Sequence, residues 1–420
     1  MRQSLTLACL LFSTALLVGQ PPANKPLWST PTTGPCRLLT TTPDGKELFT
    51  LNYKVERNNI LGLSIGRIDL SNGKELQNYL IEGIDSDELA ANSKAWQEAR
   101  FDATPDGETL LVTLPKPYSS TRQNVYGFNT LQLYDLKTGK KRGEAIPNVV
   151  TLSPGAFSES SATCFSPDGK YFWAFTKGFG EQLNIYSCTN GAVAFTIDCT
   201  ESKGAPQCAA FSADGKRMAL CLNKGATNKG SNVNVAIYSW PEGKVQKEFT
   251  LPPATTWQML HSWKGNLAYL ESMEEDDKSK AVNAAPSPHP VQAYRRVCSS
   301  FDMSADDPLS TLKKESLVGG FGGHSLGLPD IFWDAGPTWI AHYTQHVVNE
   351  KVQQAAVGKK PTTYYYWRDA KVMDAQTGKV IFEQKGLPYQ THITRDGRYL
   401  ITVGASPDLE EGIHVWQLSK

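Results

Sequence analysis

The sequence predicts an all-β fold built from seven antiparallel units of four strands each. Three observations predict it. A short apolar segment, followed by Asp-Gly and a second β-rich segment, recurs along the chain, and a second turn signal follows the copies in phase. In addition, the final unit lacks its fourth strand, while a strand-like segment near the N-terminus has no partner in its own unit.

The first turn signal is the Asp-Gly pair. Asp accepts hydrogen bonds within its own turn, and Gly takes the positive φ that such a turn requires. The pairs begin at Asp44, Asp106, Asp168, Asp214 and Asp396. The interval from Asp214 to Asp396 has room for two more copies, and Lys264-Gly265 and Asp334-Ala335-Gly336 are degenerate ones. The sequence therefore predicts hairpins at seven places.

The second turn signal ends an apolar strand that follows the hairpin. Its copies are RIDLSNGKEL, LYDLKTGKKR, IYSCTNGAVA, IYSWPEGKVQ, SFDMSADDPL and VMDAQTGKVI. The Asn-Gly and Thr-Gly pairs suit tight antiparallel turns. Each unit therefore has four strands and two hairpin turns, which is the unit of a β-propeller blade.

The repeats also carry a family resemblance. The Ser-Pro-Asp-Gly-Lys hairpin at residues 166–170 and the strands TLQLYDLKTGKK from Thr130 and IHVWQLSK from Ile413 resemble WD40 or WD40-like repeats. The resemblance covers nearly all of residues 26–420 and implies a seven-bladed β-propeller with four-stranded antiparallel blades. The family's Gly-His dipeptide does not recur with the repeats, although Gly-His stands once at residues 323–324, and the repeats mostly have Tyr or Phe in place of the Trp of Trp-Asp.

The two ends predict how the ring closes. The last strand-like segment, VWQLSK, stands where the third strand of the seventh unit belongs. The segment KPLWSTP, from Lys25, precedes the first hairpin without a partner in its own unit. We therefore expect residues Leu27 to Ser29 to pair with the strand that contains Val415 and Trp416, because this pairing covers an otherwise open sheet edge.

The N-terminal segment predicts export. Residues 1–20 have one positive charge at Arg2 and an apolar run from Leu5 to about Gly19, followed by Gln20 and two prolines. This is the layout of a secretory signal peptide, with an uncleaved anchor as the alternative. We expect residues 21–420 to form the propeller in the periplasm or outside the cell, with no membrane span after signal removal. The equal numbers of basic and acidic residues, 42 each, argue against nucleic acid as a partner.

Two insertions and one aromatic cluster provide the candidate binding surface. Units five and six are interrupted at about residues 273–292 and 345–371, and long loops in compact domains are functional or disordered. The candidate residues are Trp333, His342, His346, Tyr364, Tyr365, Tyr366 and Trp367. Exposed Tyr and Trp anchor binding surfaces, but they also fill the cores of β-strands, and the two histidines could alternatively bind a metal.

We predict no catalytic, cofactor or metal residues. The segment Gly323-His-Ser-Leu-Gly327 matches the GxSxG nucleophile motif, but Leu-Pro follows it without a helical pattern, so we interpret it as a connection between blades. The leading function is a non-enzymatic exported scaffold that binds a protein, peptide or glycan at the rim or mouth of its channel. A lactonase-like or other hydrolytic enzyme and a structural cell-envelope protein are the alternatives, since fold alone does not decide function.

One disulfide is predicted from hairpin register. A two-residue turn at Asp214-Gly215 places Cys208 directly opposite Cys221, within reach of a disulfide, whereas a four-residue loop would make them diagonal neighbours on the same face and a three-residue loop would send them to opposite faces. The same counting separates Cys188 from Cys199 along their hairpin, so we do not expect these two to pair. Two reduced, buried cysteines at 208 and 221 are the alternative.

Overall fold

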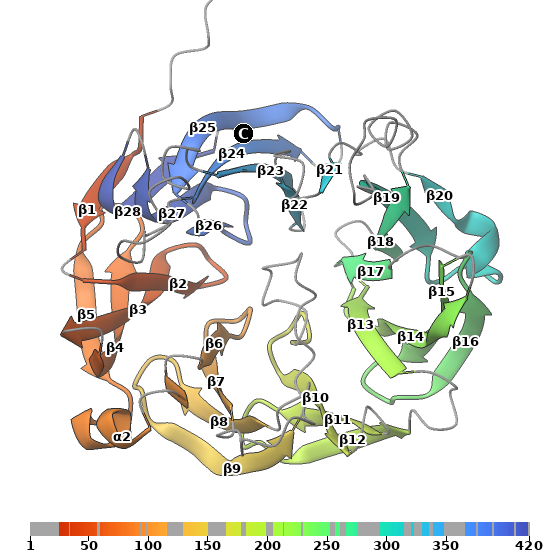
Figure 1. Cartoon of the computed structure of the whole chain (residues 1–420), viewed down its shortest axis with the longest axis horizontal. Coiled ribbons are helices and arrows are strands. Elements are labelled where there is room, and N and C mark those ends of the chain that lie inside the picture. Colours follow the sequence, from red (N-terminus) through yellow and green to blue (C-terminus); the bar gives the residue numbers. More distant parts are fainter. Residues whose placement is uncertain are drawn as a thin grey trace, which may run out of the picture.

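The computed structural model describes most of the repeated region. The described residues are 25–32, 34–56, 59–92, 95–96, 99–115, 129–149, 165–177, 182–198, 205–212, 214–227, 230–252, 257–260, 266–275, 294–314, 321–322, 330–335, 339–347, 366–374, 377–388, 390–406 and 409–418. Within them the strands form seven antiparallel sheets arranged as a ring (Figure 1). This arrangement is a β-propeller and is compatible with the predicted seven blades.

The first four blades follow the chain, each from its innermost strand outward. Blade 1 contains β2 (Cys36–Thr41), β3 (Glu47–Glu56), β4 (Asn59–Asp69) and β5 (Glu75–Leu80). Blade 2 contains β6 (Arg100–Ala103), β7 (Thr109–Pro115), β8 (Asn129–Asp135) and β9 (Lys141–Val149). Blade 3 contains β10 (Tyr171–Lys177), β11 (Gln182–Ser187) and β12 (Val193–Asp198), with an inner bridge from Phe165 to Phe172. Blade 4 contains β13 (Ala205–Phe211), β14 (Arg217–Thr227), β15 (Gly230–Ser239) and β16 (Val245–Thr250).

The remaining blades complete the ring. Blade 5 contains β17 (Trp257–Leu260), β18 (Leu267–Glu275), β19 (Tyr294–Asp302), β20 (Lys313–Lys314) and the short β21 (Phe321–Gly322), with the 3-10 helix η2 (Pro308–Thr311) before β20. Blade 6 contains β22 (Asp330–Ala335), β23 (Trp339–Val347), β24 (Tyr366–Asp374) and β25 (Val380–Pro388). Blade 7 contains β26 (Gln390–Ile393), β27 (Tyr399–Ser406), β28 (Leu409–Gln417) and β1 (Trp28–Pro31). The short helix α2 (Ser86–Ala91), capped by Asp85, lies between blades 1 and 2.

The antiparallel order gives the ring two unequal faces. The hairpins between the first and second strands and between the third and fourth strands lie at one end of each blade, which we call the turn face. The other connections leave from the opposite end, which we call the connection face. The two predicted insertions both leave from the connection face, after β18 at Glu275 and after β23 at Val347. The residues between these strands and the next ones lie outside the described part.

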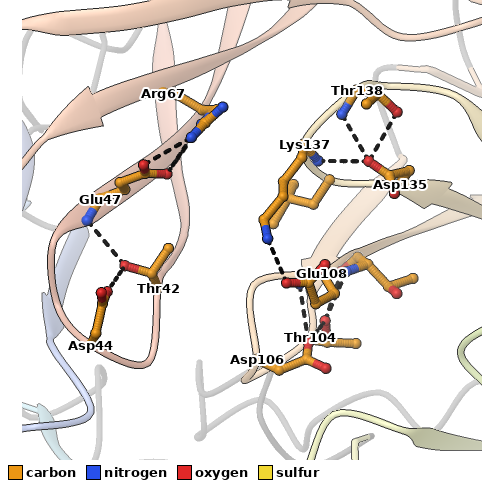
Figure 2. Close-up of polar contacts among 12 residues, drawn as sticks. Thr42, Asp44, Glu47, Arg67, Thr104, Asp106, Glu108, Asp135, Lys137 and Thr138 are labelled. Atoms are coloured by element: carbon orange, nitrogen blue, oxygen red, sulfur yellow. Dashed lines mark hydrogen bonds and ion pairs between the residues drawn. The ribbon is translucent and has the colours of Figure 1, made fainter.

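The Asp-Gly hairpins share one hydrogen-bonding pattern. In blade 2, Thr104 Oγ1 donates to Asp106 Oδ1 at 2.5 Å and accepts from Thr109 N at 2.9 Å, while Glu108 N donates to Asp106 Oδ1 at 3.0 Å (Figure 2). The hydroxyl residue at the same position of the other four hairpins makes the same two bonds; it is Thr42, Ser166, Ser212 or Thr394. The hydroxyl therefore replaces the backbone carbonyl, which already accepts from the turn glycine.

Removing this hydroxyl should destabilise the fold. Thr104 is fully buried, so Thr104→Val leaves the Thr109 N–H without its acceptor and removes one of the two donors to Asp106 Oδ1, the other being Glu108 N. We expect the free energy of unfolding to fall by about 1–3 kcal/mol, measured by urea denaturation. Thr104→Ser keeps the hydroxyl and should lose less; equal losses for the two variants would contradict the role of the hydrogen bonds.

Hairpin register agrees with the sequence in most blades. Pairing is symmetric about Asp214-Gly215, with Phe211 opposite Met218 and Cys208 opposite Cys221, although the loop has four residues rather than the predicted two. The longer loop keeps the register because Ser212 N still donates to Arg217 O at 3.0 Å.

The predicted turn at Asp334-Ala335-Gly336 is wrong in position. The structure keeps Asp334 and Ala335 in strand β22, opposite Ala341 and Ile340. The strand continues because FWDA lacks the Asp-Gly pair that sets the other turns. The next residues, 336–338, lie outside the described part of the chain.

The predicted closure is confirmed. Strand β1 pairs antiparallel with β28, with Trp28 opposite Val415 and Ser29 opposite His414, and Leu27 N donates to Val415 O at 2.6 Å. The ring of His414 adds a hydrogen bond to Ser29 Oγ at 2.9 Å. The indole of Trp28 donates to Leu70 O of blade 1 at 2.7 Å, so β1 ties the last blade to the first.

The core lies between neighbouring blades. Large side chains from blades 1 and 2, such as Phe49, Leu63, Phe101 and Leu110, pack together and are almost fully buried. Comparable apolar layers lie between blades 2 and 3, 3 and 4, 4 and 5, 6 and 7, and 7 and 1. The apolar strand faces therefore hold the blades side by side around the channel.

Candidate functional site

The predicted binding residues belong to blade 6. Backbone register places Trp333 opposite His342 and His346 opposite Trp367. Because strand positions alternate between faces, these four positions share one face of the sheet. Tyr366 begins β24, whereas Tyr364 and Tyr365 lie outside the described residues. The binding role of this set stays a prediction.

The predicted disulfide also stays a prediction. Register places Cys208 directly opposite Cys221. Cys188 follows β11 at the turn, whereas Cys199 lies outside the described residues. We expect peptide mapping of the protein purified without reductant to recover residues 208 and 221 in one linked fragment, because directly opposed strand positions lie within disulfide reach. Free thiols at both positions would contradict this expectation; reduction before digestion, which should release the two peptides, is the control.

A different polar site lies on the innermost strands of blades 7, 1 and 2. Strand β2 contacts both β6 and β26, and all three strands face the centre of the ring (Figure 1). Thr40, Asp102 and His392 occupy equivalent positions, each four residues before the aspartate of its turn. These three positions therefore lie at the same level of the innermost strands. We call Thr40, Asp102 and His392, together with Arg37 and Arg100, the polar wall.

Asp102 is the acidic group of the polar wall. Desolvation raises the pKa of its carboxyl, although the positive charges of Arg37 and Arg100 act in the opposite direction. The side chain is half-buried, and within the described part of the chain it has neither a hydrogen bond nor an ion pair. A partly exposed carboxylate whose pKa is raised is a candidate for ligand contact.

His392 is the second unpartnered group. Desolvation lowers the pKa of its imidazole to about 4, so the ring is neutral at pH 7. Among the described residues, no side chain or backbone group forms a hydrogen bond with it. A neutral imidazole offers one N–H donor and one nitrogen acceptor, and both are available here.

Gln390 closes the strand edge beside these residues. Its Oε1 accepts from Leu38 N at 3.0 Å, and its Nε2 donates to Cys36 O at 3.2 Å. Strand β2 is the innermost strand of blade 1, so the Gln390 amide occupies backbone groups that would otherwise face the channel. This contact also fixes blade 7 against blade 1.

The turn face is narrowed next to the polar wall. A Cβ built on Gly45 would lie 2.6 Å from the Asp396 carboxylate, and one built on Gly169 would lie 2.4 Å from that of Asp106. The turns of blades 7 and 1, and those of blades 2 and 3, therefore touch. Arg395 Nη1 of blade 7 also donates to Pro167 O of blade 3 at 2.9 Å, across two intervening blades.

Polar contacts in blades 1 and 2 support the same turns. The guanidinium of Arg67 binds both carboxylate oxygens of Glu47, at 2.8 and 2.7 Å, and Lys137 Nζ binds Glu108 Oε1 at 2.6 Å (Figure 2). Asp135 accepts from the backbone and hydroxyl of Thr138, both at 2.9 Å. Because these charged groups already have partners, we interpret them as groups that stabilise the turns.

The described residues contain neither a metal-binding cluster nor a membrane-spanning helix. No group of three or more His, Cys, Asp or Glu side chains there is placed to hold a metal ion. No helix in that part of the chain is long and apolar enough to cross a membrane.

The chain was compared with known proteins. No family model and no curated protein matches it. Solved structures that resemble it include the Myceliophthora thermophila Cps50 (Swd1) β-propeller domain, with 11% identity over 93% of this chain and 99% of that chain and a TM-score of 0.45. Another is a prolyl endopeptidase, with 12% identity over 94% of this chain and 51% of that chain and a TM-score of 0.48. A third is the β-propeller domain of the Trilobed protease from Pyrococcus furiosus, with 12% identity, coverage of 77% and 85%, and a TM-score of 0.41.

Proposed function

We propose that the chain is an exported, non-enzymatic β-propeller scaffold that binds its partner, a protein, peptide or glycan, at the polar wall of the channel. One observation carries the proposal. Asp102 and His392 lie on the innermost strands of neighbouring parts of the ring, are partly exposed and show no hydrogen bond to another described residue. Polar groups placed in this way are open to contact with a partner.

Capture from the cell envelope tests this function. The intact protein, the Asp102→Asn/His392→Gln double variant and the control Glu248→Gln are immobilised, and bound protein and carbohydrate are both quantified. Glu248 is exposed on the outer strand β16, far from the channel in sequence and sheet order. We expect the double variant to capture at least tenfold less partner than the intact protein, and the control to capture the same amount. Equal capture by all three proteins would refute a role for the polar wall.

A hydrolytic enzyme is the second candidate, and the same two residues favour it. A carboxyl with a raised pKa and a neutral imidazole are the groups that general acid–base catalysis uses. Turnover of a captured ligand by the intact protein, lost in the double variant, would support catalysis. Retention of the unchanged ligand would support the scaffold.

Export is the second part of the proposal, and the first 20 residues motivate it. The apolar run ends before the strand β1 begins at Trp28, so cleavage near Gly19 would leave the closing strand intact. Mass spectrometry of the protein from the periplasm or medium should find an N-terminus close to Gln20. A full-length N-terminus in the soluble cell extract would refute export.

A further inference from the structure

One side chain of the turn face joins two hairpins that are not neighbours in the ring. Arg395 Nη1 of blade 7 donates to Pro167 O of blade 3 at 2.9 Å, although blades 1 and 2 lie between these two blades (Figure 1). We propose that Arg395 is a clasp, which ties the inner hairpin of blade 3 to blade 7 and so joins the inner hairpins of blades 7, 1, 2 and 3 into one unit. The inference does not depend on the polar wall.

The first step is the identity of the residue at the tip of each hairpin. Arg395 directly precedes the aspartate of its turn, and the other Asp-Gly hairpins have Pro43, Pro105, Pro167 or Ala213 at this position. Proline and alanine carry no side-chain donor, whereas a guanidinium presents five N–H donors at the end of a long side chain. Among the Asp-Gly hairpins, that of blade 7 therefore has the tip residue that can bond to a hairpin beyond its neighbours.

The second step is the availability of the acceptor. In the blade 3 turn, Ser166 O accepts from Gly169 N at 2.9 Å, and Ser166 N donates to Tyr171 O at 2.8 Å. The hydrogen bonds within this described turn do not use Pro167 O. Arg395 therefore adds a bond without displacing one, and its charge strengthens that bond.

The third step is the set of contacts between the intervening hairpins. Arg398 Nη2 of blade 7 donates to Asp44 O of blade 1. A Cβ built on Gly107 of blade 2 would lie 3.7 Å from Thr42 Cα of blade 1, and one built on Gly169 of blade 3 would lie 2.4 Å from the turn carboxylate of blade 2. Contacts therefore run from blade 7 through blades 1 and 2 to blade 3, and the Arg395 bond closes the circle.

The hairpin of blade 4 provides the contrast. Gly215 occupies the same turn position as Gly45 and Gly169, but a Cβ built on it meets nothing within 4 Å. The inner turns of blades 5 and 6 lie outside the described residues. Within the described part of the ring, the circle of packed hairpins thus ends between blades 3 and 4.

The expected consequence of losing the clasp is local. The Arg395 bond is exposed to solvent, so water can replace either partner and the net contribution to global stability is small. Local opening of a hairpin needs much less free energy than unfolding of the whole protein. The effect should therefore appear in amide exchange of the joined hairpins rather than in the denaturation midpoint.

Hydrogen exchange followed by mass spectrometry of the full chain tests the clasp. We expect Arg395→Ala to raise the exchange rate in residues 166–171 about threefold or more, the change that one hydrogen bond of ordinary net strength predicts. A smaller rise is expected in residues 104–109, because Gly169 packs on that turn. Residues 212–217 of blade 4 should exchange as in the intact protein.

Two further variants make the result specific. Arg395→Lys keeps a cationic donor on a long side chain and should restore part of the protection in residues 166–171. Lys216→Ala removes an exposed cation from the hairpin of blade 4 and should leave residues 166–171 unchanged. Circular dichroism and urea denaturation verify that all three variants keep the fold.

The opposite outcomes are equally clear. Unchanged exchange in residues 166–171 of the Arg395→Ala protein would overturn the clasp. Equal increases in residues 166–171 and 212–217 would also overturn it, because they would indicate general loosening. A rise confined to residues 166–171, with none in residues 104–109, would refute the four-hairpin unit. Partner capture is measured separately, so either proposal can fail while the other stands.

Discussion

Replacing Trp28 with alanine should lower the free energy of unfolding by about 2–4 kcal/mol. Trp28 belongs to β1, pairs with Val415 and donates its indole N–H to Leu70 O at 2.7 Å. The ring also packs on the turn of blade 1, where a Cβ built on Gly73 would lie 2.7 Å from Cε3 of Trp28. The substitution therefore weakens the contact that joins the first and last blades, and urea denaturation measures the loss.

Two controls make this result specific. Trp28→Phe keeps much of the apolar contact and removes the hydrogen bond, so it should lose about 1 kcal/mol. Leu76→Ala removes an apolar side chain that is 46% exposed on the outer strand β5 and should have little effect. Hydrogen exchange should show the largest loss of protection in β28. Equal stability of the Trp28→Ala and Leu76→Ala proteins would contradict the proposed role of Trp28 in closure.

Replacing Gly143 with alanine should be more harmful than the same change at Gly215. Both glycines have positive φ, 65° and 67°, so alanine adds about 1–2 kcal/mol of backbone strain at either position. A Cβ at Gly143 would also lie 2.1 Å from Asn190 O of the neighbouring blade, whereas a Cβ at Gly215 meets nothing within 4 Å. The clash should add about 1–3 kcal/mol, because the two blades must move apart.

Thermal or urea denaturation of the two alanine variants measures this difference. Gly215→Ala is the matched control, since it shares the residue change and the backbone conformation. A loss at position 143 no larger than that at position 215 would show that blades 2 and 3 can separate there without cost.

The sequence predicted the architecture well because turn chemistry is local. Asp and Gly define the turn wherever they occur together, so register around Asp214-Gly215 follows from counting. The prediction failed at Asp334, where degenerate residues leave the turn position open and strand pairing continues through Ala335. The hydroxyl residues, such as Thr104, were missed, although their constant position two residues before the aspartate is a readable signal.

The polar wall could not be predicted in the same way. Asp102 and His392 belong to different blades, and no motif surrounds either residue. Asp102 and His392 are recognised as equivalent only when the positions before each turn aspartate are aligned. Both residues lie near blade 1 only because the ring closes. The aromatic residues around Trp367 are adjacent in the sequence and therefore form a visible pattern. Adjacency alone, however, does not place side chains in the channel.

The pairing of β1 with β28 also affects when the protein can finish folding. Trp28 leaves the ribosome early, but its partner Val415 is synthesised 387 positions later (from 28 to 415). Loops of that length close slowly, so blade 7 cannot form while the chain is still being made. An exported chain would then remain open, and so able to pass through a narrow translocation pore, until its last strand arrives. If the chain is exported as proposed, ring closure would link the completion of folding to the completion of transport.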